Sequence, residues 1–196
     1  MDSKQVIQVK GECNILTKEP SNIIAIRSRK WIISALLELM AEKKYDKITT
    51  QNIIERADLT RQTFYRHFKS KDFVLFAYIA QLYEALVEEV NKLEVKTFYA
   101  VLVVYFEFWK NHRDFLNLLN KTEFRYDPIE CYHTYMEKIL STVENQICSE
   151  KVDTKYIQSF MAGGLGNIKN TWINDNYQES PEKLSEIIVT LLGEKH

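Results

Sequence analysis

The sequence predicts an all-α protein, with an N-terminal three-helix domain that contains a helix-turn-helix and a C-terminal helical domain. Apolar residues recur at helical spacing along much of the chain, as they do at Ile32, Leu36 and Leu39. Between residues 49 and 71, two short helical stretches are separated by a turn of about four residues, which is typical of a helix-turn-helix. A chain of 196 residues is long enough to bury the cores of two such domains.

The first helix of the N-terminal domain is expected to follow residues 1–20, a flexible extension without a helical or strand period. Ser21 can act as the N-cap of this helix. Its apolar positions, which include Ile32 and Met40, lie on one face. We therefore expect the helix to support the two shorter helices that follow it.

The helix-turn-helix lies between Thr49 and Lys71. Thr49 can cap the first short helix and Thr60 the second, because a threonine hydroxyl accepts a hydrogen bond from the free N–H groups of a first helical turn. Phe64 and Phe68 are four residues apart and so face inward together. The side chains of the first turn that then face outward are Thr60, Arg61, Gln62 and Thr63. These groups can bond phosphates and base edges, which indicates a DNA-recognition surface.

Residues 27–74 resemble the DNA-binding domain of the TetR/AcrR family of bacterial regulators. The residues that carry the resemblance are Ile48-Thr49-Thr50, Arg56-Ala57-Asp58-Leu59-Thr60 and Thr63-Phe64-Tyr65-Arg66-His67-Phe68-Lys69-Ser70-Lys71. The chain has Lys44 and Asp58 where the family usually has glycine. Because both glycines serve a positive φ, we expect local strain of a few tenths to about 1 kcal/mol at these positions and an unchanged fold.

Individual roles follow for the polar side chains of this domain. We expect sequence specificity to reside in Arg61, Gln62, Thr63 and Arg66, with Gln51 on the preceding helix as a helper. The resemblance implies phosphate contacts for Thr49, Thr50, Tyr65, His67 and Lys71. The basic group Arg27, Arg29 and Lys30, beside Trp31, could also contact the DNA backbone, with a plain packing role for Trp31 as the alternative.

The charge distribution supports this interpretation. Between Arg27 and Lys71 there are 11 Lys or Arg against 5 Asp or Glu, an excess of six positive charges. The whole chain carries a net charge of −1, so the remainder carries −7. A basic front and an acidic rear suit a protein that meets phosphate at one end.

A long helix is expected after the helix-turn-helix. Ser70 can cap it, and Asp72 lies in its positively polarised first turn. We interpret residues 72–95 as a connecting helix between a DNA-binding domain of residues 21–71 and an effector-binding and dimerisation domain of residues 96–196.

The start of the C-terminal domain is predicted to be a buried helix or one wall of a ligand pocket. Glu107 is the only charged residue between Phe98 and Trp109, so this helix is apolar on nearly every side. The candidate ligand-binding residues are Tyr105, Trp109, Phe115, Tyr126, Tyr132, Tyr135 and Met136. Because charges are scarce here, we expect an apolar or aromatic effector, with an ordinary aromatic core as the alternative.

The last two helices are candidates for a dimer interface. Ser180 can cap the final helix, Asn176 can end the preceding one in the left-handed conformation, and three glycines inside that preceding helix indicate close backbone approach. The candidate interface residues are Phe160, Gly163, Gly164, Asn167, Ile168, Leu184, Ile187, Ile188 and Leu191. Their pattern resembles the helix pair through which TetR-family proteins form homodimers.

The C-terminal half also resembles a branch of the family that includes DhaS, an activator of dihydroxyacetone-kinase genes. The resembling residues include Phe108-Trp109, Ala162-Gly163-Gly164-Leu165 and Trp172-Ile173. The family implies a regulator, usually a repressor, that binds a palindromic operator as a homodimer and responds to a small molecule. The branch implies an alternative, an activator or architectural regulator whose C-terminal domain binds a protein partner.

Other classes of protein are disfavoured. There is no nucleophile elbow, no glycine-rich phosphate loop and no metal-ligand spacing, so we expect neither an enzyme nor a bound metal or cofactor. Cys13, Cys131 and Cys148 show no disulfide or zinc pattern. No apolar run reaches the roughly 18 residues of a membrane span, and the N-terminus lacks a signal peptide, so we expect a cytoplasmic protein.

Overall fold

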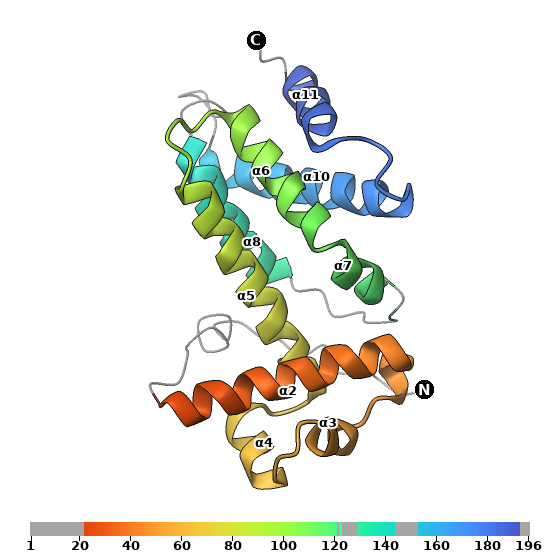
Figure 1. Cartoon of the computed structure of the whole chain (residues 1–196). Coiled ribbons are helices and arrows are strands. Elements are labelled where there is room, and N and C mark those ends of the chain that lie inside the picture. The colour runs from red at the N-terminus through yellow and green to blue at the C-terminus, as the bar shows by residue number, and fades with distance from the viewer. Residues whose placement is uncertain (1–21, 121, 123–128, 144–152, 193–196) are drawn as a thin grey trace, which may run out of the picture. The chain divides into compact units, whose positions relative to one another are not determined.

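The computed structural model describes residues 22–120, 122, 129–143 and 153–192, and every regular element in these ranges is a helix (Figure 1). The elements are α2 (Ile23–Glu42), η1 (Tyr45–Lys47), α3 (Thr50–Arg56), α4 (Arg61–His67), α5 (Lys71–Asn91), α6 (Phe98–Asn111), α7 (Arg113–Asn120), α8 (Ile129–Leu140), η2 (Ser141–Val143), α10 (Thr154–Asn174) and α11 (Pro181–Leu191). The predicted all-α class is confirmed. The chain divides into two compact units within α5, between Gln81 and Leu82.

Helix α2 supports the first unit. Its N-cap is Asn22, whose side chain accepts a hydrogen bond from the Ile24 N–H at 2.9 Å, whereas the predicted cap Ser21 lies outside the described residues. Ile32 and Leu36 of α2 are fully buried, as are Ile53 of α3 and Phe64 of α4. The three helices therefore share one apolar core, as the sequence pattern predicts.

The two short helices start where their threonines predict. The Thr49 hydroxyl accepts from the Asn52 N–H at 3.2 Å, and the Asn52 side chain accepts from the Thr49 N–H at 3.1 Å, which completes a capping box. The Thr60 hydroxyl accepts from the Thr63 N–H at 3.1 Å. Both predicted caps are confirmed.

The backbone conformation differs between Lys44 and Asp58, the two positions at which the family usually has glycine. Asp58, in the turn between α3 and α4, has φ 52, so the predicted left-handed conformation is confirmed there. Lys44 has φ −58, so the prediction of strain at this position is wrong. Lys44 is the extended residue before η1, and any residue adopts that conformation without cost.

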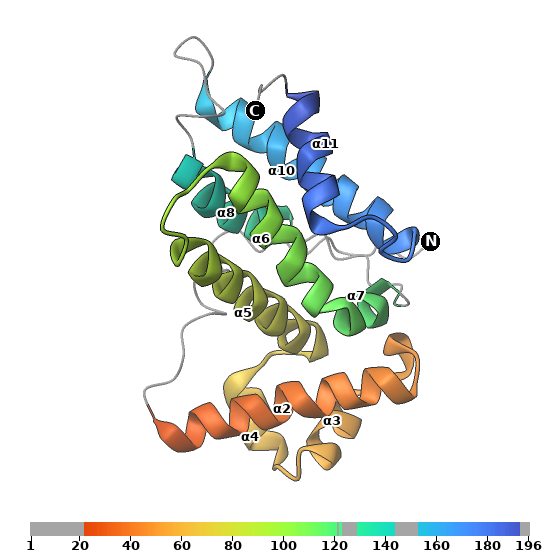
Figure 2. The same ribbon diagram turned by 45° about the horizontal axis from the view of Figure 1, so that its top comes forward.

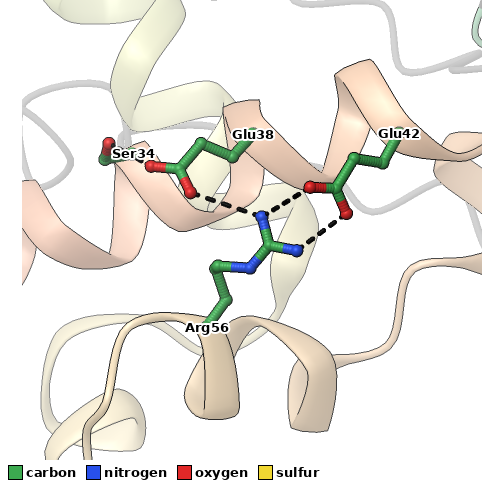
Figure 3. A network of polar contacts seen from close by, with 4 residues as sticks. All are labelled: Ser34, Glu38, Glu42 and Arg56. Atoms are coloured by element: carbon green, nitrogen blue, oxygen red, sulfur yellow. Dashed lines mark hydrogen bonds and ion pairs between the residues drawn. The ribbon is translucent and has the colours of Figure 1, made fainter.

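An arginine joins α3 to α2 on the solvent side (Figure 3). Arg56 Nη1 donates to Glu38 at 3.3 Å and to Glu42 at 2.9 Å, while Nη2 donates to the second oxygen of Glu42 at 2.7 Å. Ser34 donates to the other oxygen of Glu38 at 3.0 Å. The hydrogen bond from Arg56 lowers the pKa of Glu42. This network bridges α3 and α2 at the exposed edge of their apolar contact.

The second unit contains the rest of α5, α6, α7, most of α8, η2, α10 and α11. Helix α6 is its centre, with Phe98, Tyr105, Phe106 and Trp109 each at most 1% exposed. Helix α11 packs along α6 (Figure 2). The prediction that α6 is buried on most sides is confirmed.

Helix α10 ends in the left-handed conformation predicted at Asn176, which has φ 55. The Tyr177 N–H donates to the Trp172 carbonyl at 2.9 Å, and the Asn176 N–H donates to the Ile173 carbonyl at 3.1 Å, which forms a Schellman motif. Ser180 then caps α11 by accepting from the Lys183 N–H, as predicted. No helix in the described ranges is long and apolar enough to cross a membrane.

Candidate nucleic-acid interface and ligand domain

Helix α4 presents the predicted reading surface to solvent. Phe64 is fully buried and Phe68 is 2% exposed, so these two rings fix the inner face of the helix. On the outer face, Arg61, Gln62 and Arg66 are exposed, and Thr63 is half-buried. The side chains expected to read bases are therefore accessible from outside the domain.

A hydrogen bond joins α3 to α4 at this surface. Arg61 Nη2 donates to the side-chain oxygen of Gln51 at 3.2 Å, and Gln51 Nε2 donates to Glu55 at 2.8 Å. Gln51 thus positions the guanidinium of Arg61, and each side chain keeps polar atoms for a base edge. The structure brings together the predicted reader and its predicted helper.

The residues expected to hold phosphate differ in their exposure to solvent. Thr49 and Tyr65 are exposed, and Tyr65 is 53% exposed with its ring against Phe64. Thr50 is half-buried in the first turn of α3. The Thr60 and Thr63 hydroxyls lie 2.9 Å apart at the start of α4. These residues surround two helix N-termini, where backbone N–H groups favour anions.

Lys71 has a structural role that the resemblance did not predict. Its ammonium donates to the backbone carbonyls of Tyr45 at 2.7 Å and Ile48 at 2.8 Å and lies over the Tyr45 ring. Partial burial lowers the pKa of Lys71. Its ammonium thus ties the η1 segment to the start of α5, and the phosphate contact expected of Lys71 stays a prediction.

His67 and Arg29 are also engaged inside the unit. His67 Nε2 is buried without a hydrogen-bond partner, and desolvation, together with the charges of Arg66 and Arg29, lowers the pKa of His67. Arg29 is 7% exposed and lies over the Phe68 ring. Arg27, by contrast, is exposed and lies over Trp31, itself 48% exposed.

Asn52 contributes to this surface and was not predicted. Its side-chain oxygen closes the capping box and also accepts a hydrogen bond from Lys43 at 2.8 Å. The signal was present in the sequence, because a residue three positions after a threonine cap commonly bonds back to the cap. Asparagine was overlooked since glutamate or glutamine usually holds that position.

The predicted ligand-binding residues form a packed aromatic cluster in the second unit. Tyr105, Trp109, Phe115, Tyr135 and Met136 are buried, Tyr132 is half-buried, and Tyr126 lies outside the described residues. Tyr83 is central, with its ring centroid 5.0 Å from that of Trp109 and 5.6 to 5.7 Å from those of Tyr132 and Tyr135. This packing is the alternative that the sequence left open.

A pocket of about 230 Å³ lies beside this cluster. Its lining is formed by Leu116, Leu119, Asn120, Thr122, Lys169, Asn170 and Ile173. None of the predicted ligand-binding residues is among them, so that part of the expectation gains no support here. Lys169 was not predicted to line a pocket, because a single lysine on a helix gives no sequence signal of such a position.

Two family models match the chain. The model of the bacterial regulatory proteins of the tetR family matches residues 32–78, and a transcriptional regulator C-terminal region matches residues 96–194. The chain belongs to the TetR family. Proteins of this family are DNA-binding transcriptional regulators and not enzymes, so membership also confirms the prediction that the chain is not an enzyme.

Individual relatives agree with this assignment. The chain is 25% identical over 179 residues to the uncharacterized HTH-type transcriptional regulator YvdT of Bacillus subtilis, covering 82% of this chain and 91% of that protein. Its fold is similar to that of the fatty acid degradation regulator FadR from Bacillus halodurans, with a TM-score of 0.60, 18% identity and coverage of 84% and 94%. It is also similar to the dihydroxyacetone kinase operon activator DhaS, with a TM-score of 0.55, 21% identity and coverage of 84% and 93%.

The last two helices of this TetR-family chain expose an apolar face. Phe160 on α10 is 69% exposed and Leu191 on α11 is 74% exposed, while a Cβ added at Gly163 or Gly164 would meet nothing within 4 Å. Asn167 and Ile187 are also exposed, and Ile168 is half-buried. Leu184 and Ile188 are buried within the protomer, and their place in a dimer interface stays a prediction.

Proposed function

We propose that this TetR-family regulator binds a palindromic operator as a homodimer, acts as a repressor in the cytoplasm and responds to a small-molecule effector. The observation that carries the proposal is the exposed outer face of α4, on which Arg61 is positioned by Gln51 above a buried aromatic anchor. An arginine presented in this way can bond the O6 and N7 atoms of guanine in a major groove.

The homodimer is supported by the exposed face of α10 and α11. Large apolar side chains such as Phe160 and Leu191 are rarely left so exposed in groups on a monomer. The two glycines beside them would let a second helix approach closely. Two protomers related by a two-fold axis would place two α4 helices in successive major grooves, about 34 to 36 Å apart.

Effector response is supported by the pocket beside the aromatic cluster. Its volume of about 230 Å³ suits a small molecule, and Tyr83 of the neighbouring cluster lies on α5, the helix that begins directly after the reading helix. A ligand that binds one conformation of α5 better than another would shift the protein toward that conformation.

A second candidate is regulation through a protein partner. It is favoured by one observation, the dense packing of Tyr105, Trp109 and Met136 where a ligand was expected. In that case the C-terminal domain would offer a surface and not an interior site. Operator binding measured with and without small molecules separates the two candidates, because a protein-partnered regulator would show no change with any of them.

Selection of bound sequences from a random DNA pool tests the proposal. The proposal requires enrichment of one sequence with two inverted half-sites, and a complex that contains two protomers. An enriched site without internal symmetry would contradict the homodimeric mode of binding, and a pool without any enrichment would contradict specific DNA recognition.

A further inference from the structure

Lys169 on α10 has an unusual environment. Its ammonium lies 4.3 Å from the ring centroid of Trp109 and 5.7 Å from those of Tyr83 and Tyr132. It also donates a hydrogen bond to the Tyr83 hydroxyl at 3.2 Å. Three aromatic rings from three different helices thus surround one cation.

The charge of this ammonium is not balanced within the described residues. None of their carboxylates forms an ion pair with Lys169, and Glu84, on the helix that carries Tyr83, instead accepts a hydrogen bond from Tyr135 at 3.4 Å. Burial lowers the pKa of Lys169 to about 8, so the group is still largely protonated at neutral pH. Cation–π attraction offsets only part of the hydration that a partly buried ammonium loses. Such an uncompensated charge is typical of a site that receives a counter-charge from outside.

The pocket gives access to this side chain. Lys169 lines it together with the amides of Asn120 and Asn170 and the hydroxyl of Thr122, while Leu116, Leu119 and Ile173 supply apolar walls. A volume of about 230 Å³ corresponds to seven or eight water molecules at roughly 30 Å³ each. A ligand of that size would carry one polar group and a short apolar body.

We propose that Lys169 is the anchor for the carboxylate of a small monocarboxylic acid whose apolar body lies against Leu116, Leu119 and Ile173. The carboxylate supplies the missing counter-charge, and the amide groups of Asn120 and Asn170 can donate further hydrogen bonds to it. This inference rests on the proposed ligand response for its regulatory meaning. It adds one negative charge to the apolar or aromatic effector that the sequence of α6 predicts.

A calorimetric titration of the full-length protein tests this assignment. The probes are phenylacetate and hexanoate, each paired with its neutral amide, phenylacetamide or hexanamide. The carboxylates should bind at least tenfold more tightly than the amides. Lys169→Met should remove this preference, and Lys138→Met should retain it, because Lys138 is an exposed cation over a tyrosine ring in the same unit.

A second measurement needs no variant and so does not depend on the folding of Lys169→Met. At pH 8.5 the carboxylates should bind with uptake of protons, because a bound anion raises the pKa of Lys169, and the amides should bind without it. The uptake is read from titrations in buffers of different ionisation enthalpy. Equal affinity for acid and amide, absence of proton uptake, or failure of both carboxylates to bind would overturn the assignment. DNA takes no part in these titrations, so loss of the proposed operator binding would appear only in a separate DNA titration.

Discussion

Arg61 is the residue whose predicted role depends most directly on local geometry. Its guanidinium is exposed on α4 and held by Gln51 at 3.2 Å. Arg61→Ala should weaken operator binding by about 1 to 3 kcal/mol and relax the preference at one base position, if the guanidinium contacts guanine in the bidentate manner. A fluorescence titration against the operator and its single-base variants measures both effects.

Lys47→Ala is the matched control for Arg61→Ala. Lys47 is an exposed cation of the same unit that lies 3.8 Å from Asp46 and not on the reading face. Its loss should leave the base preference unchanged. If both variants weakened all sequences alike, Arg61 would act as a general positive charge and not as a reader.

His67 should make the stability of the protein depend on pH. Burial and the nearby arginines lower its pKa in the folded state, so the unfolded state takes up a proton first as the pH falls below the ordinary value of about 6.5. The stabilising contribution is thus present above that pH and is lost as the pH falls through the folded-state pKa. The fall in the free energy of unfolding from pH 7.5 to 5.5 should be smaller in His67→Gln, measured by urea denaturation. An equal fall in the free energy of unfolding over this pH range in both proteins would contradict the role assigned to His67.

The role of a side chain was predictable from sequence where its partners are close in the chain. Thr49 and Thr60 were identified as caps because a cap needs only the backbone that follows it. The engagement of Lys71 with carbonyls of η1 could not be predicted, since its partners are 23 and 26 residues away in the chain. The same holds for the contacts of Lys169 with aromatic rings of three other helices.

At the scale of elements, α10 carries the proposed dimer contact. Gly164→Leu should weaken the homodimer by about 1 to 3 kcal/mol, because a bulky side chain would separate two closely packed helices. The fold of the protomer should survive, since a Cβ at this position meets nothing within 4 Å. Sedimentation equilibrium measures the change. A monomeric wild-type protein at micromolar concentration, or an equally tight dimer in the variant, would contradict the assignment.

A different glycine of α10 provides a contrast inside the protomer. A Cβ at Gly166 would lie 3.2 Å from the Tyr132 hydroxyl, which is itself held by a hydrogen bond to the Ala162 carbonyl at 2.7 Å. Gly166→Ala should therefore lower the free energy of unfolding by about 1 kcal/mol or more, despite the better helix propensity of alanine. Denaturation of both proteins at equal concentration checks this, and a stabilised variant would show that Tyr132 moves freely.

Element boundaries were mostly predictable because caps and periodicity act over short distances. Ser180 and Asn176 mark the ends of their helices as the sequence indicated. The three glycines of α10 looked equivalent in sequence, but within the described part of the chain only Gly166 lies against another side chain. Which face of a helix is covered by a neighbour depends on tertiary packing, which periodicity does not specify.

At the scale of the whole molecule, regulation requires that ligand binding and DNA binding favour different conformations. Helix α5 runs from Lys71 to Asn91 through both compact units, and Tyr83 on it contacts the ammonium of Lys169. A variant at Trp109 is unsuitable for testing this link, because Trp109 is 1% exposed and its loss would cost about 3 to 5 kcal/mol. Lys169 offers a less disruptive site for such a test.

The family and the fold were predictable from sequence because the helix-turn-helix signature is contiguous over residues 48–71. The proposed ligand site was not, because the pocket is assembled from α7, the segment after it and α10, which are about 50 residues apart in the chain. The aromatic residues that were predicted to bind a ligand form the core beside that pocket. Charge and apolar content alone do not separate a core from a cavity wall.

The spacing of operator half-sites tests the central claim most directly. A homodimer that places two α4 helices in successive major grooves requires half-sites on one face of the duplex. Insertion of about five base pairs between the half-sites rotates one of them by half a helical turn, to the opposite face. We predict that equilibrium titration will show at least a hundredfold loss of affinity for the altered operator and full recovery when the inserted base pairs are removed. Unchanged affinity at every spacing would contradict recognition by a two-fold pair of α4 helices.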